Sequence, residues 1–203
     1  MSNEFLFKIV LIGSGKVDKT SLIRRYADIK FDKSYLPTHG VDITTKKIII
    51  ENYNVKLILV DTAGQEFFGK LRPSYYRGAS ACIIFFDKQD RDSFNDIPKW
   101  YEEFRQYTHS PQVPIAVVGV SSQVPPQPSQ YISYIEGKKG NYDLTTQTKL
   151  SFSVDIMNNI SSEEAQALME QLDNCTFFNC TLTNKNELDV VVEHLVKEFL
   201  SRS

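Results

Sequence analysis

The chain has 203 residues, of which 24% are charged and 41% hydrophobic, and its formal net charge is −2 at pH 7. This composition is typical of a soluble globular protein, and the slight acidity gives no sign of nucleic-acid binding. Cys82, Cys175 and Cys180 are too few and too scattered for a disulfide framework or a zinc site, so we expect buried thiols in a cytoplasmic protein.

Apolar β-branched runs alternate along the chain with amphipathic stretches of helical spacing. In chain order, the predicted strands are 5–12, 46–50, 55–60, 81–86, 113–119 and 175–180. The predicted helices are 20–27, 93–107, 161–172 and 187–200. Strands 46–50 and 55–60 should pair as an antiparallel hairpin, and the alternation elsewhere predicts a mostly parallel six-stranded sheet with helices on both faces. In such an α/β fold, ligands bind at the carboxyl ends of the strands.

One loop at such an end carries a nearly complete phosphate-binding motif. The pattern is glycine, four free positions, then Gly-Lys-Ser/Thr, and Asp18 stands where the second glycine belongs. The residues of this candidate site are Gly13, Ser14, Gly15, Lys16, Val17, Asp18, Lys19, Thr20 and Ser21. Such a loop directs backbone N–H groups at a polyphosphate, so a carboxylate in it should repel the ligand.

The segment 61–66 makes the resemblance specific, because Asp-Thr-Ala-Gly-Gln-Glu follows the third strand. Together with the loop, it resembles the nucleotide site of the Ras superfamily of small GTPases. The segments 38–42 and 75–79 resemble the Rab branch, and the likeness covers residues 5–107 and 161–199. It implies a P-loop G domain that spans residues 1–203.

The resemblance also implies the roles of several residues. Lys19 would bind the outer phosphates, and Gly64 would donate an N–H to the terminal one. Thr20, Thr38 and Asp61 would hold Mg²⁺, while Gln65 would orient the attacking water. Phe31 would contact the edge of the base of GTP or GDP.

The base-reading half departs from the family pattern. The family's Asn-Lys-x-Asp segment aligns with residues 120–123, which read Val-Ser-Ser-Gln, and its Ser-Ala-Lys segment aligns with Thr-Leu-Thr at 181–183. Loss of the aspartate should reduce guanine preference by several kcal/mol, on the order of a lost buried charged hydrogen bond. Lys16 also replaces a glycine, so we expect a strained loop and weaker nucleotide binding.

Residues 121–160 form an insertion that is long for a connection without structure of its own. Apolar residues fall on even positions from Tyr142 to Ile156, which is strand periodicity and predicts a β-hairpin beside the base site. A surface decoration unrelated to function is the alternative.

Partner binding is expected by resemblance at the two switch regions, Thr38 to Asp42 and Phe67 to Arg72. The chain ends at Ser203 without the cysteines that Rab proteins use for prenylation, so we expect no direct lipid anchor. A monomer, recruited to membranes through effector or regulatory proteins, is the expectation.

Three functions remain open at this point. The first is a divergent Rab-like switch that binds guanine nucleotide weakly with Mg²⁺ and hydrolyses GTP slowly through Gln65. The second is a pseudo-GTPase scaffold with no useful nucleotide affinity, and the third is a nucleotide binder with relaxed base specificity.

Overall fold

The computed structural model describes residues 4–15, 17–29, 40–62, 72–108, 110, 112–121, 159–182 and 184–202. They contain a six-stranded sheet with the order β2-β3-β1-β4-β5-β6. The strands are β1 (Glu4–Gly13), β2 (Val41–Ile50), β3 (Tyr53–Thr62), β4 (Ala81–Asp87), β5 (Ile115–Ser121) and β6 (Cys175–Thr181). Only β2 and β3 pair antiparallel, and the other four pairings are parallel, as predicted.

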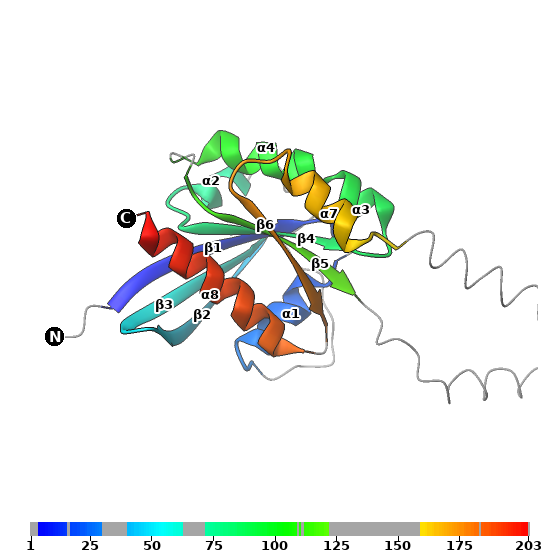
Figure 1. Cartoon of the computed structure of the whole chain (residues 1–203). Helices are drawn as coiled ribbons and strands as arrows, with labels where there is room; N and C mark the ends of the chain where they lie inside the picture. The colour runs from blue at the N-terminus through cyan, green and yellow to red at the C-terminus, as the bar shows by residue number, and fades with distance from the viewer. Residues whose placement is uncertain are drawn as a thin grey trace, which may run out of the picture.

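Helices cover both faces of this sheet (Figure 1). One face carries α1 (Lys19–Tyr26) and the long α8 (Lys185–Ser201). The other carries α2 (Arg72–Tyr76), α3 (Arg91–Asn95), α4 (Ile97–Tyr107) and α7 (Ser162–Met169). No helix among the described residues is long and apolar enough to cross a bilayer.

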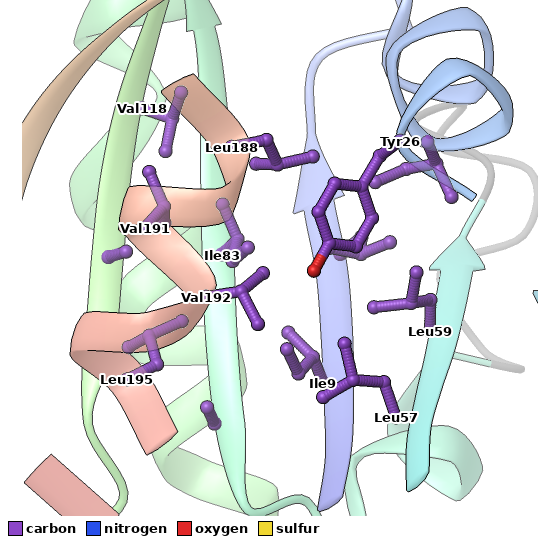
Figure 2. Close-up of a cluster of buried hydrophobic side chains, with 14 of the residues drawn as sticks. Ile9, Tyr26, Leu57, Leu59, Ile83, Val118, Leu188, Val191, Val192 and Leu195 are labelled. Carbon is purple, nitrogen blue, oxygen red and sulfur yellow. The ribbon is translucent and has the colours of Figure 1, made fainter. Parts of the chain in front are cut away.

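Two hydrophobic cores follow from this layering. Figure 2 shows the first, in which Leu188, Val191 and Leu195 of α8 face the sheet residues Ile83 and Val118. Every one of these side chains is at most 1% exposed. The second core lies beneath α4, whose buried residues are spaced three and four apart and include Trp100 and Phe104. Both faces of the sheet are therefore covered by tightly packed side chains, and this packing holds the carboxyl ends of the strands in fixed positions.

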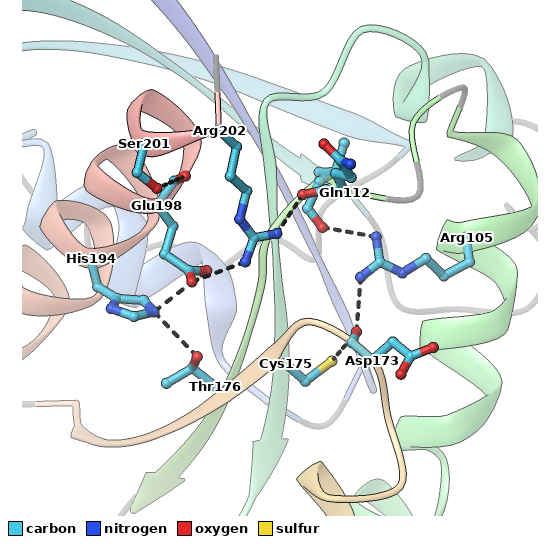
Figure 3. A network of polar contacts seen from close by, with 10 residues as sticks. Arg105, Gln112, Asp173, Cys175, Thr176, His194, Glu198, Ser201 and Arg202 are labelled. Carbon is cyan, nitrogen blue, oxygen red and sulfur yellow. Dashed lines mark hydrogen bonds and ion pairs between the residues drawn. The ribbon is translucent and has the colours of Figure 1, made fainter.

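Polar side chains tie the opposite end of the molecule together, where β5 and β6 begin (Figure 3). Arg105 of α4 donates to the carbonyl oxygens of Val113 and Asp173, at 2.8 and 3.0 Å. Arg202, just after α8, donates to the carbonyl of Gln112 at 2.9 Å. These contacts fasten loops and helix ends at the edge that lies away from the phosphate loop.

The structure corrects three details of the expected elements. The single helix predicted over 93–107 is two helices that meet at Asp96, because Pro98 in the first turn of α4 has no N–H to continue the bonding of α3. The short α2 was not predicted. Cys175 is only half-buried, whereas Cys82 and Cys180 are buried thiols as expected, and all three are free.

The insertion leaves and rejoins the described fold at neighbouring points. Lys88 N–H donates to Val120 O at 3.0 Å, and Lys88 O accepts from Ile160 N–H at 2.8 Å. Residues 122–158, which include the segment predicted to form a hairpin, lie outside the described residues.

Candidate phosphate and metal site

The candidate loop begins where β1 ends, at a glycine that the sheet requires. Gly13 has φ +133°, and a Cβ at this position would lie 2.2 Å from Phe85 O of β4. No other residue could adopt this backbone without moving β4. From Gly13 the chain turns, with Val17 N–H donating to Ser14 O at 3.2 Å, and enters α1 at Lys19.

Lys19 is buried at the start of α1, with only 4% of its surface exposed. Its ammonium donates to the carbonyl oxygens of Gly13 and Ser14, each at 3.0 Å. A buried ammonium requires such partners because desolvation penalises the charge. The loop thus fixes a positive charge at the carboxyl end of β1, where an outer phosphate is expected.

Thr20 and Asp61 meet across the same edge of the sheet. Thr20 Oγ1 donates to Asp61 Oδ2 at 2.5 Å, which joins the first turn of α1 to the end of β3. Asp61 is 3% exposed, and burial raises the pKa of its carboxyl although the Thr20 hydroxyl and the Lys19 charge oppose the shift. Its other oxygen, Oδ1, is buried and has no hydrogen-bond partner among the described residues.

This pair fits a hard cation. An unsatisfied buried carboxylate oxygen beside a hydroxyl is the donor set that Mg²⁺ prefers, and a nearby cation would offset the cost of burying the charge. Among the described residues, no three His, Cys, Asp or Glu side chains gather closely enough to hold a metal. The other ligands would be phosphate oxygens, water and the hydroxyl of Thr38 that the resemblance implies.

Contrary to our expectation, Asp18 does not strain the loop. Its backbone has φ −76°, which any residue can adopt, and its side chain caps α1 by accepting from Ser21 N–H at 3.2 Å. The carboxylate thus occupies one of the free donors at the helix N-terminus, which is also the kind of donor that binds a phosphate.

Glu187, a residue that we did not single out, holds the segment that aligns with the family's Ser-Ala-Lys. Glu187 of α8 accepts from the N–H of Thr181 at 2.5 Å and from its hydroxyl at 3.1 Å. Its second oxygen accepts from Asn184 at 3.0 Å, and Leu182 N–H donates to Ser121 O at 3.5 Å. The only sequence signal for this was an acidic residue in the first turn of a predicted helix, which is common and not specific.

The structure brings together part of the predicted site. Gly13, Ser14, Lys19, Thr20, Ser21 and Asp61 gather where β1 and β3 end, with Gly15 and Asp18 in the same loop and Val17 in the core beneath it. The described residues do not include Lys16, Phe31, Thr38, Gly64 and Gln65, nor residues 38–39 and 67–71 of the predicted switch regions. Their roles remain predictions.

Comparisons with known proteins agree with this arrangement. The family model described as Ras family matches residues 8–201. The GTP-binding protein YPTM1 of Zea mays is 44% identical over 111 residues, which cover 54% of this chain and 53% of the relative. The GTP-binding protein ypt1 of Schizosaccharomyces pombe is 44% identical over 104 residues, 51% of each chain.

A third relative extends further along the sequence. The Ras-related protein Rab-11B of Dictyostelium discoideum is 39% identical over 136 residues, which cover 67% of this chain and 60% of the relative. The matched region thus spans between half and three fifths of the length of these relatives.

Proposed function

Because the chain belongs to the Ras family, we propose that it is an atypical Rab-like switch that binds guanine nucleotide with Mg²⁺ and hydrolyses GTP slowly. Its setting would be vesicle trafficking or signalling, in the cytoplasm and at membranes reached through partner proteins. The relatives that carry GTP-binding and Rab names support the class of ligand.

One observation carries the proposal: Thr20, Asp61 and Lys19 converge at the carboxyl ends of β1 and β3. Lys19 would bind the outer phosphates, while Thr20 and Asp61 would hold Mg²⁺. When bound, the ion would neutralise charge on the phosphates. Gln65 would orient the attacking water. Hydrolysis is expected to be slow because P-loop GTPases turn over slowly until an arginine finger stabilises the charge of the transition state.

Weak binding follows from the base end. Glu187 already takes the N–H and hydroxyl of Thr181, and no aspartate stands at 123 to accept from a guanine ring. Affinity would therefore come mainly from the phosphates and Mg²⁺, through charge-assisted hydrogen bonds.

A protein-binding scaffold without nucleotide is the second candidate. The internal pairing of Asp18, Lys19 and Glu187 favours it, because these groups have partners in the protein itself. Such a scaffold would present the segments Thr38 to Asp42 and Phe67 to Arg72 to partner proteins.

Titration of the nucleotide-stripped protein with fluorescent GTP, GDP and ATP, with and without Mg²⁺, separates these functions. We expect GTP binding weaker than about 1 μM, tighter with Mg²⁺ than without. In Thr20→Val the gain from Mg²⁺ should disappear, because the hydroxyl that contacts the ion is gone. The surface variant Glu102→Gln, on α4, should retain it.

The other outcomes decide against the proposal. If none of the three nucleotides binds at high micromolar protein, the scaffold function is favoured. Equal affinity for GTP and ATP would indicate a nucleotide binder with relaxed base specificity.

If GTP binds, a single-turnover assay of Gln65→Leu should show slower hydrolysis than the wild type.

A further inference from the structure

The N-terminus of α1 already holds an anion, the carboxylate of Asp18. The side-chain oxygen Oδ1 of Asp18 accepts from Ser21 N–H at 3.2 Å, and its backbone carbonyl accepts from Leu22 N–H at 3.3 Å. The first N–H groups of a helix have no partner within the helix and carry the positive end of its dipole. They therefore bind anions, whether these belong to a ligand or to the chain.

The other polar groups of the loop also find partners within the protein. Two backbone carbonyls hold the ammonium of Lys19, and the hydroxyl of Thr20 is bound to Asp61. These two side chains, like Ser21 N–H, thus have partners in the protein before any phosphate binds. A glycine at position 18 would leave Ser21 N–H without this side-chain acceptor.

We propose that Asp18 is a resident anion of the phosphate loop: its carboxylate stabilises the nucleotide-free loop, and an incoming phosphate must displace it from Ser21 N–H. A phosphate that binds Ser21 N–H, the Lys19 ammonium or the Thr20 hydroxyl then competes with a contact that already exists. The inference rests on the proposed function only for the identity of the ligand, because the displacement can be tested with a phosphate that has no base.

Two substitutions separate the cap from the charge. Asp18→Asn keeps a capping oxygen but removes the charge, whereas Asp18→Ala removes both and leaves the backbone unstrained. Glu102→Gln removes the same charge from an exposed position on α4 and serves as the control.

The first readout is the melting temperature of the nucleotide-free protein. We expect Asp18→Ala to melt about 2–4 °C below the wild type, and Glu102→Gln to melt within about 1 °C of it. Asp18→Asn should melt between the wild type and Asp18→Ala, because it keeps the capping oxygen but loses the charge at the helix N-terminus. If Asp18→Ala melts with the wild type, the carboxylate does not stabilise the loop and the inference is wrong.

The second readout is the affinity for Mg²⁺-pyrophosphate, which carries phosphates without a base. Binding should tighten about three- to thirtyfold in Asp18→Ala, which removes both the competing oxygen and its charge, and should not change in Glu102→Gln. The gain in Asp18→Asn should be smaller, because its amide oxygen still competes for Ser21 N–H. Equal affinity in the wild type and the Asp18 variants, or no binding in any of them, would overturn the displacement. Pyrophosphate binding without GTP binding would support the resident anion and count against the proposed function.

Discussion

Asp61 holds its two carboxylate oxygens in different states. One accepts the hydroxyl of Thr20, and the other is buried without a partner. Desolvation raises the pKa of this carboxyl, so the charged form is less favoured in the folded protein than in the unfolded chain. The residue therefore costs stability in the nucleotide-free protein, and a cation would recover it.

This predicts the behaviour of Asp61→Asn. At neutral pH the nucleotide-free variant should melt higher than the wild type by about 2 °C or more, because a neutral amide is cheaper to bury than a charged carboxylate. The stabilisation that Mg²⁺ and nucleotide give the wild type should be lost. Scanning calorimetry with and without these ligands measures both effects, with Glu102→Gln as the control. A lower melting temperature together with retained Mg²⁺ dependence would contradict this account.

At the residue scale, sequence patterns identified the members of the site better than their contacts. Lys19, Thr20 and Asp61 were predicted by motif, and the structure brings them together. Asp18 was interpreted as a failed glycine, although an aspartate directly before a helix is also a typical N-cap. Only the geometry of the loop shows that its carboxylate faces Ser21 N–H.

Among the elements, the loop between β6 and α8 depends on one side chain. Glu187 accepts three hydrogen bonds from Thr181 and Asn184, all within a few residues of it. The helix thereby holds Thr181 and Asn184, on either side of the segment that aligns with the family's Ser-Ala-Lys.

Glu187→Ala should therefore reduce the free energy of unfolding by about 1–3 kcal/mol, because it leaves the partly buried Thr181 N–H without its acceptor. Glu187→Gln keeps one acceptor oxygen, so its free energy of unfolding should lie between those of the wild type and Glu187→Ala. The control is Glu193→Ala, which removes an exposed ion pair with Lys197 and should cost at most about 1 kcal/mol.

Urea denaturation measures these differences, and hydrogen exchange at Thr181 N–H reports the contact directly. Identical stability and exchange in Glu187→Ala and Glu193→Ala would show that the loop does not need Glu187.

Element types were easier to predict than element ends. The hydrophobic spacing placed all six strands and the long helices, because buried faces impose their period on the sequence. The break at Asp96 was missed, since the apolar spacing continues through it while the bonding does not. The five-residue α2 was missed because it is too short to show a helical period.

At the scale of the whole molecule, the described residues before and after the insertion are anchored next to each other. Val120 and Ile160 both bind the backbone of Lys88, so the ends of the segment 122–158 are held close together. Loop-closure entropy grows slowly with length, and a long connection between two adjacent anchors adds little cost to folding.

Replacing residues 122–158 with a Gly-Ser linker of about six residues should thus leave the sheet intact and raise the free energy of unfolding by about 1–2 kcal/mol. Circular dichroism and urea denaturation test the fold, and a GTP titration of the same variant tests whether the segment matters to the site. A variant that fails to fold would show that the segment supplies contacts the core requires. A second Gly-Ser linker of the same length and different order controls for effects of the linker sequence.

Gly13 has a consequence for how ancestry and activity are told apart in such proteins. A side chain at this position would collide with Phe85 O on the neighbouring strand, whether or not a ligand is bound. A descendant of this fold that had abandoned nucleotides altogether would still have to keep that glycine. Gly13 alone is therefore no evidence that the protein binds a nucleotide today. Such evidence must come from positions that the sheet does not constrain, such as Thr20 and Asp18.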